Sequence, residues 1–126
     1  MPNIMSSPIL VVEDNSDLQL LFKLILESAG YKVAMADNGK DAFDYVDQIK
    51  PQLILMDIMM PDTNGLQVTR NIKQLQNNQL PILLVSAIDR LDDEQLQDSK
   101  ADGILYKPFD IDELISRVGE LTTQSH

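Results

Sequence analysis

The sequence predicts an α/β fold, in which a doubly wound, five-stranded parallel sheet carries helices on both faces. The first observation is that short apolar runs alternate with longer amphipathic stretches five times along the 126 residues. The second is that three of those runs are continuously apolar, as strands buried on both faces of a parallel sheet are. Because connections between parallel strands are right-handed, few topologies remain, and we expect the flavodoxin-like strand order 2-1-3-4-5.

Five short runs are expected to form the strands. Residues 9–12, 53–56 and 82–85 are apolar throughout, which suits the middle of the sheet. Residues 32–36 and 103–106 are less uniformly apolar, and we expect them nearer the sheet edges.

The stretches between the strands show helical periodicity. Gly30 and Pro51 are placed to end the first and second helices, and Gly65 precedes the third. Residues 92–100 form the most polar helix, and the last helix begins at Asp110 with a capping-box pattern. The apolar stripes are Leu18, Leu21, Phe22, Ile25 and Ala29; Ala42, Val46 and Ile49; Val68, Ile72 and Leu75; Leu96 alone in the fourth helix; and Ile111, Leu114, Ile115, Val118 and Leu121.

Length and composition indicate one domain, expected at residues 9–122, with short tails at 1–8 and 123–126. The net charge of -10 argues against direct binding to nucleic acid or to an anionic membrane surface. The absence of cysteine excludes disulfides, zinc thiolate sites and cysteine nucleophiles. No apolar run approaches the ~20 residues that span a bilayer, and the tail of residues 1–8 does not resemble a signal peptide. We therefore expect a cytoplasmic protein.

Polar side chains follow the predicted strands at one end of the sheet. Glu13 and Asp14 end the first strand, Asp57 the third, Ser86 the fourth and Lys107 the fifth. In doubly wound sheets the functional crevice lies outside the carboxyl ends of the strands. These five side chains should therefore converge there.

The residue types at this end suit phosphoryl transfer. Three neighbouring carboxylates repel one another, and a hard cation such as Mg²⁺ is the natural counter-charge. Lys107 adds a positive charge and Ser86 a hydroxyl donor. A carboxylate can itself accept a phosphoryl group, and Asp57 is the best placed of the three acids. Taken singly, each residue also has a plain structural explanation as a loop polar group, a cap or a solvated charge.

Five sequence blocks together resemble the signature set of response-regulator receiver domains of two-component signalling systems. The resemblance covers about residues 9–121. The blocks are Val12-Glu13-Asp14-Asn15, Leu55-Met56-Asp57, Met60-Pro61-Asp62-x-x-Gly65, Val85-Ser86-Ala87 and Lys107-Pro108-Phe109.

The resemblance implies a role for each matching residue. Asp57 is the phosphorylation site, and Lys107 pairs with the phosphoryl oxygens. The peptide bond between Lys107 and Pro108 is cis. Ser86 is the switch hydroxyl. Mg²⁺ is held by Glu13, Asp14, Asp57 and the main-chain carbonyl of Met59.

The resemblance also implies partners. The phosphoryl donor is a phosphohistidine on a sensor histidine kinase or on a histidine phosphotransfer protein. The protein is a switch and not an enzyme, and it acts on a downstream protein target that the sequence does not identify. The face often used for signalling is formed by residues 92–100, the fifth strand and the last helix. His126 is a tail residue and not a phosphate carrier.

Two departures from the family pattern produce two hypotheses. Ile104 stands where many receivers have an aromatic ring, and Tyr106 is not expected to replace that ring, so the signal should pass through Ser86 and the loop after it. Met59 and Ile88 stand where the side chains that flank attacking water are found. Because neither can orient a water by hydrogen bonding, we expect a long-lived phosphoryl group, although both residues could simply pack over the site.

Three alternatives stay open at this point. A phosphatase of the haloacid-dehalogenase type also uses an aspartate, Mg²⁺ and a lysine, but needs a second Asp where Met59 stands. A flavodoxin-like FMN carrier needs a phosphate loop after the first strand, where this sequence has Glu13 and Asp14. A degenerate receiver that only binds partners would not need the full acidic set.

Overall fold

A computed structural model describes residues 7–61, 63–77, 79–87 and 91–123. Its five strands form one parallel sheet in the order β2-β1-β3-β4-β5, as the sequence predicts. The strands are β1 (Ile9–Val12), β2 (Val33–Ala36), β3 (Leu53–Asp57), β4 (Ile82–Ala87) and β5 (Gly103–Lys107). The two less apolar runs, β2 and β5, lie at the edges of the sheet.

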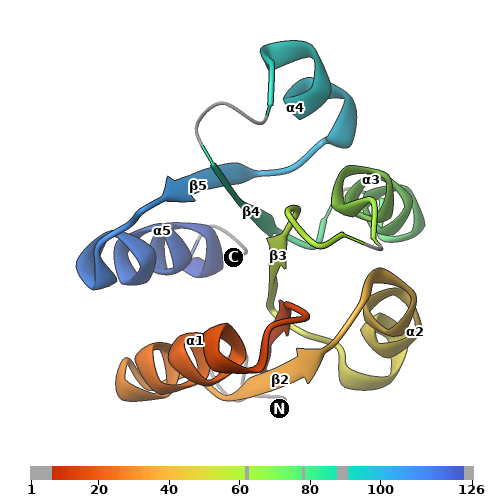
Figure 1. The fold of residues 1–126 in the computed structure, drawn as a ribbon. Coiled ribbons are helices and arrows are strands. Elements are labelled where there is room, and N and C mark those ends of the chain that lie inside the picture. The colour runs from red at the N-terminus through yellow and green to blue at the C-terminus, as the bar shows by residue number, and fades with distance from the viewer. Residues whose placement is uncertain (1–6, 62, 78, 88–90, 124–126) are drawn as a thin grey trace.

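Five helices connect and follow these strands (Figure 1). They are α1 (Ser16–Ser28), α2 (Gly39–Ile49), α3 (Gly65–Leu75), α4 (Asp93–Ser99) and α5 (Ile111–Thr123). The side chains of Asn15, Asn38, Asn64 and Asp92 each accept a backbone hydrogen bond at the start of a helix, which is the usual role of Asn and Asp at that position. Gly30, with φ of 97°, follows α1, where only glycine takes this conformation without strain.

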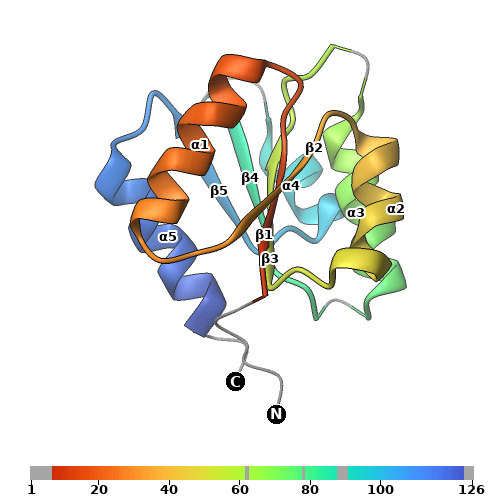
Figure 2. The same ribbon diagram turned by 90° about the horizontal axis from the view of Figure 1, so that it is seen from below.

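The helices form two layers, one on each face of the sheet. In the two views, α1 and α5 lie together on one side of the strands, and α2 and α3 lie on the other (Figure 2). Phe22, Leu26, Leu114 and Val118 from α1 and α5 pack against alternate residues of the strands. Ala42, Val46 and Ile72 from α2 and α3 pack against the remaining strand residues, with Leu96 of α4 beside them. The core therefore has two halves separated by the sheet, as in a doubly wound fold.

The predicted stripes are correct in their helices but not in every residue. Leu21 is 44% exposed, Leu75 49% and Ile111 54%, whereas Leu26 of α1 is fully buried. Periodicity locates the apolar face of a helix, but the residues at the margin of that face are buried or exposed according to what packs beside them.

An ion pair between the buried Lys73 and the partly exposed Asp102 connects α3 to the amino-terminal ends of the strands. The ammonium of Lys73 is 2.7 Å from Oδ2 of Asp102 and donates to the carbonyl of Leu80 at 2.9 Å. The backbone N–H of Ile82 also donates to Asp102, at 2.8 Å. Since Leu80 precedes β4 and Asp102 precedes β5, the pair ties one helix to the starts of two strands, far from the strand ends that carry the predicted site.

Among the described residues, no helix is both long enough and apolar enough to span a bilayer.

Candidate functional site

Asp57 is the last residue of β3, and its carboxylate has two donors. Lys107 Nζ lies 3.1 Å from Oδ2, and the backbone N–H of Met59 donates to Oδ1 at 2.8 Å. Asp57 shares its face of β3 with Leu55, and Lys107 shares its face of β5 with Leu105, and both leucines belong to the core half under α1 and α5. The lysine therefore reaches over the intervening strand to the carboxylate. Asp57 is only 3% exposed, so this charge is neutralised inside the protein.

The carboxyl group of Glu13 lies beside that of Asp57, and each group shifts the pKa of the other. Burial, followed by the neighbouring Asp57, raises the pKa of Glu13 from its ordinary 4.5 to about 8. Burial also acts to raise the pKa of Asp57, but Glu13, the Met59 amide and Lys107 stabilise the ionised form and hold that pKa below its usual value. Without a metal, the pair therefore keeps one proton on Glu13 and the negative charge on Asp57.

The arrangement fits a divalent cation at this point. Oε1 of Glu13 is buried, and no hydrogen bond reaches it from the described residues, so a carboxyl oxygen next to Asp57 is left without a partner. Asp14 contacts Glu13 but is exposed to solvent. Across the described ranges, no three acidic or histidine side chains form a preformed metal cage. Mg²⁺ does not require one, because it keeps several waters and takes one or two carboxylates.

The loop that carries Glu13 is held by side chains that the sequence pattern did not single out. Gln19 of α1 donates to the carbonyl of Glu13 at 2.5 Å and to Asp37 at 2.7 Å. The backbone N–H of Asn15 donates to Oε2 of Glu13 at 3.0 Å. These bonds fix the acidic loop against α1. Gln19 lies one turn into α1, and nothing in the neighbouring sequence indicates that its side chain holds the acidic loop.

Ser86 is fully buried, but its hydroxyl is turned away from Asp57. Its Oγ donates to the carbonyl of Ala87 at 3.0 Å. In the β4–β5 pairing, Ser86 lies opposite Tyr106 and Leu84 opposite Ile104. Ser86 and Tyr106 therefore share the face that lies under α2 and α3, whereas Asp57 points to the other face.

The side chain of Met59 bridges the ends of β3 and β4. Its sulfur accepts a hydrogen bond from the backbone N–H of Ala87 at 3.2 Å, and the residue is 38% exposed. Met59 therefore contacts Asp57 with its backbone and the end of β4 with its side chain. The partner position named from the sequence, Ile88, lies outside the described residues.

Aromatic packing anchors the segment after Lys107. The rings of Phe109 and Phe22 stack with centroids 5.8 Å apart and planes 14° apart. The Lys107–Pro108 peptide bond is cis, as expected. Since Phe22 belongs to α1, this stack ties the carboxyl end of β5 to the helix that also holds the acidic loop.

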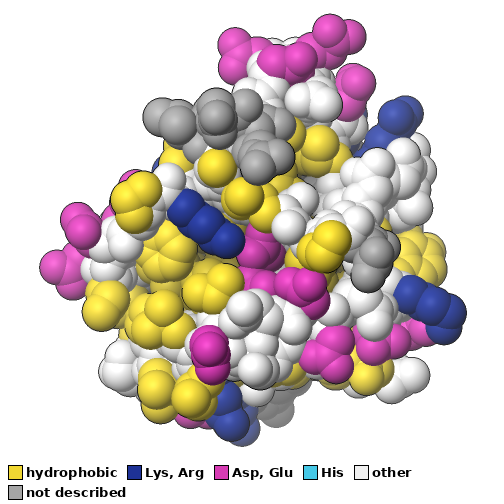
Figure 3. Space-filling view, in the orientation of Figure 1, with side chains coloured by type: hydrophobic (Ala, Val, Ile, Leu, Met, Phe, Trp, Pro, Cys, Tyr) yellow, Lys and Arg dark blue, Asp and Glu magenta, His cyan; other side chains and the backbone are white. Residues whose placement is uncertain are grey.

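Acidic side chains gather at the middle of this face of the molecule, next to a basic side chain (Figure 3). A second acidic group projects from the region of α4 at the top of the same view. The exposed acids there are Asp92, Asp93, Glu94 and Asp98.

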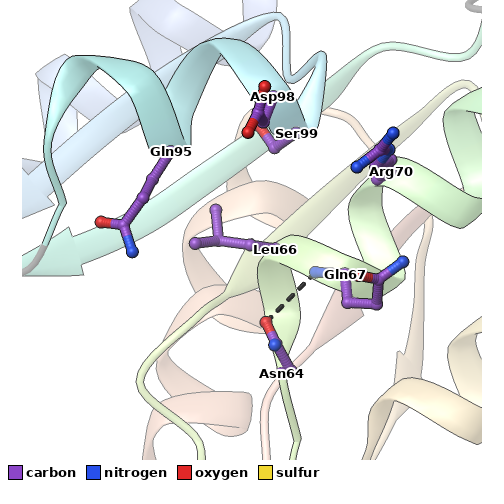
Figure 4. Close-up of a pocket in the computed structure, with 7 residues that line it drawn as sticks. All are labelled: Asn64, Leu66, Gln67, Arg70, Gln95, Asp98 and Ser99. Carbon is purple, nitrogen blue, oxygen red and sulfur yellow. Dashed lines mark hydrogen bonds between the residues drawn. The ribbon is translucent and has the colours of Figure 1, made fainter.

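A groove of about 170 Å³ between α3 and α4 is separate from this site. Leu66 points into the gap between the two helices, with Arg70 on the α3 side and Gln95 and Asp98 on α4 (Figure 4). None of the residues that line it belongs to the predicted site.

Comparison with known proteins agrees with this geometry. A sequence model of the response regulator receiver domain matches residues 9–119. The DNA-binding dual master transcriptional regulator RpaA of Synechocystis is 34% identical over 115 residues, which are 90% of this chain and 48% of that protein. Sporulation initiation phosphotransferase F of Bacillus subtilis is 33% identical over 113 residues, which are 87% of this chain and 89% of that protein. The chain thus spans about half the length of RpaA, but most of the phosphotransferase.

A solved structure has the same fold over nearly the whole chain. The receiver domain of the Francisella response regulator 1452 superimposes with a TM-score of 0.84 and 32% identity, covering 96% of this chain and all of that one. The match to the family covers the five strands and the strand-end residues Glu13, Asp14, Asp57, Ser86 and Lys107. The chain therefore belongs to the family of response regulator receiver domains, which act in two-component signalling.

Proposed function

We propose that the protein is a phosphorylation switch in which Asp57 accepts a phosphoryl group from a phosphohistidine. The observation that carries this proposal is the buried Asp57 carboxylate, which faces the ammonium of Lys107 at 3.1 Å and stands next to the carboxyl of Glu13. A buried carboxylate with a cation on one side and a second acid on the other suits a site that takes up a phosphate and a metal together.

In the transfer step, one carboxylate oxygen of Asp57 forms a bond to phosphorus while the bond between phosphorus and the donor imidazole nitrogen breaks. The imidazole leaves with the electron pair of that bond. The transferred group adds negative charge beside Asp57, and Lys107 is placed to neutralise it. Burial keeps bulk water from weakening this interaction.

Mg²⁺ would supply the remaining positive charge, as it neutralises phosphoryl oxygens in such reactions when bound. Glu13, Asp14 and Asp57 are the side chains that would hold it, together with the main-chain carbonyl of Met59. The uncompensated Oε1 of Glu13 supports this assignment. Glu13 must lose its proton for metal to bind.

Ser86 is proposed to turn toward the phosphoryl group after transfer. Its present bond, to the carbonyl of the next residue, is one that a charged phosphoryl oxygen would outcompete. Without an aromatic ring at Ile104, we infer that the change passes from Ser86 into the loop after β4. Tyr106 lies beside Ser86 in the sheet, so a structure with a phosphoryl mimic in which its ring changes rotamer would contradict this hypothesis.

The proposed phosphoryl donor is a sensor histidine kinase or a histidine phosphotransfer protein. The relative named as a phosphotransferase of sporulation matches over most of its own length, which is consistent with a phosphorelay. RpaA is named as DNA-binding, but this chain matches only 48% of it. The net charge of -10 supports a domain that does not itself contact nucleic acid. We propose a cytoplasmic switch at residues 9–122 that changes a protein-binding surface on α4, β5 and α5, and that is not an enzyme toward other substrates.

The experiment is incubation with Mg²⁺ and acetyl phosphate, followed by measurement of the intact mass. We expect one phosphoryl group per chain, and none in Asp57→Asn, which keeps the shape of the side chain but removes the nucleophile. Steady turnover of phosphate esters would favour a phosphatase of the haloacid-dehalogenase type. A bound yellow chromophore would favour an FMN carrier. A wild-type mass that never changes would reject the proposal.

A further inference from the structure

Two hydrogen-bond donors lie at the end of β4, and one of them, the backbone N–H of Ala87, has a weak acceptor as its partner. The Ser86 hydroxyl donates to the carbonyl of Ala87 at 3.0 Å, and the Ala87 N–H donates to the sulfur of Met59 at 3.2 Å. A thioether sulfur is a weak acceptor. The Ala87 amide is therefore satisfied only loosely, at the edge of a site built to hold a strongly accepting group.

The Ala87 amide is directed at the loop that follows Asp57. β3 and β4 remain hydrogen-bonded just past Asp57, where Ile58 N donates to the carbonyl of Val85 at 3.1 Å. Beyond this bond the sulfur of Met59 takes the place that a backbone carbonyl would have in a longer ladder. The backbone of the same methionine donates to Oδ1 of Asp57 at 2.8 Å. One residue thus joins the phosphoacceptor to the end of the neighbouring strand.

We propose that Met59 is a displaceable latch, whose sulfur occupies the Ala87 N–H until a phosphoryl oxygen on Asp57 takes that hydrogen bond. The inference rests on the proposed function of Asp57. A hydrogen bond to a charged oxygen is about twice as strong as one between neutral groups, so the exchange favours the phosphorylated state. Methionine is flexible and 38% exposed here, so its side chain can leave without disturbing the core.

The latch predicts an effect of removing the sulfur that would not be seen if the Met59 side chain only packed over the site. The substitution Met59→Leu keeps an apolar side chain of similar volume but removes the sulfur acceptor. In the unphosphorylated variant only solvent can then accept from the Ala87 amide, because this bond is exposed, while the phosphorylated state is unchanged. From the strength of a weak neutral hydrogen bond, we expect a phosphoryl mimic to bind about two- to fivefold more tightly to the variant.

The test measures fluoroberyllate binding to the full chain in the presence of Mg²⁺, together with the amide resonance of Ala87 in the metal-free protein. In Met59→Leu, the Ala87 proton resonance should move upfield and the mimic should bind more tightly. Met35→Leu, the same change on the edge strand β2, should leave both unchanged. Thermal unfolding of each variant checks that the fold is retained.

The possible results separate this inference from the function on which it rests. Equal or weaker binding in Met59→Leu, or an unmoved Ala87 resonance, overturns the latch while wild-type binding at Asp57 still supports the receiver function. A wild-type protein that binds no fluoroberyllate overturns both. In the supporting case, the methyl resonance of Met59 in the wild type also shifts when the mimic binds.

Discussion

The ammonium of Lys107 reaches Oδ2 of Asp57 at 3.1 Å, although a whole strand separates the two residues in the sheet. The contact forms because both side chains point to the same face, and because the lysine side chain is long enough to cross β4. It places the positive charge of Lys107 beside the carboxylate of Asp57, the proposed phosphoacceptor.

The first prediction concerns this contact. Lys107→Ala should lower the rate of phosphorylation by acetyl phosphate by about ten- to a hundredfold, the range expected when a hydrogen bond to a charged group is lost. Labelling with Mg²⁺ present, followed by intact mass, measures the rate. Lys40→Ala is the control, because Lys40 is exposed and pairs with Asp44 on α2. Equal rates for the Lys107 variant and the wild type would show that the contact is incidental.

The second prediction is a pH dependence of Mg²⁺ binding. The raised pKa of Glu13, about 8, means that metal must displace a proton at lower pH. The affinity for Mg²⁺ should therefore rise with pH and level off above about pH 8. Calorimetric titration in buffers of different ionisation enthalpy would detect the released proton. Glu13→Gln should bind more weakly, without proton release. A wild-type affinity that stays flat from acid to alkaline pH would contradict the assignment.

The raised pKa of Glu13 also makes the stability of the fold depend on pH. Because the pKa of Glu13 is higher in the folded protein than its ordinary 4.5, its contribution is fully present below pH 4.5 and is lost as pH rises through about 8. The lowered pKa of Asp57 acts in the opposite sense, favouring the fold above its ordinary value of 3.8. Mg²⁺ should consequently raise the melting temperature more at alkaline than at mildly acidic pH.

The third prediction concerns the lifetime of the phosphoryl group. A polar side chain at position 59 could orient an attacking water, which the methionine cannot do. Met59→Asn should therefore shorten the half-life of the phosphorylated protein severalfold, as measured by loss of the phosphoryl mass after donor is removed. Ile88→Glu should act in the same direction. Unchanged decay in both variants would mean that these side chains only pack over the site.

The fourth prediction concerns Gly65, the first residue of α3. A Cβ at this position would lie 2.9 Å from the backbone Cα of Ile58, next to Asp57. Gly65→Ala should destabilise the protein by about 1–3 kcal/mol, as overpacking does, and should also slow phosphorylation by shifting the loop. Gly119→Ala is the matched control, since nothing lies within 4 Å of its added Cβ. That variant should be about 0.5–1 kcal/mol more stable than the wild type. Urea unfolding of both variants provides the comparison.

The fifth prediction concerns the ion pair of Lys73 and Asp102 at the opposite end of the sheet. Asp102→Ala should destabilise the protein by about 1–3 kcal/mol, because the buried ammonium of Lys73 loses its hydrogen bond to a charged group. The double variant Lys73→Met/Asp102→Ala should cost less than the sum of the single changes. Fluoroberyllate affinity should be unchanged where the protein remains folded, since the pair lies away from Asp57. An additive double variant would show that the two residues do not act together.

The sequence by itself determined the order and type of the elements and the positions of the candidate site residues. Continuous apolar runs in β1, β3 and β4 predict buried strands because a strand covered on both faces needs apolar side chains on both. Once the parallel order is known, the carboxyl ends of these strands must meet, so the sequence alone predicts that Glu13, Asp57 and Lys107 lie near one another. The cis bond before Pro108 was likewise expected from the family resemblance.

Only the tertiary structure decided how these side chains meet. Three features depend on distances between residues far apart in the chain. They are the raised pKa of Glu13, the hydrogen bond from the Ala87 amide to the sulfur of Met59, and the contact of the buried Lys73 with Asp102. Periodicity and residue type do not contain those distances, because they record only which face of an element a residue occupies. For the same reason the sequence could not show that Leu21 and Ile111 are exposed. Local pattern determined where Asp57, the proposed phosphoacceptor, lies, and packing in three dimensions decided what surrounds it.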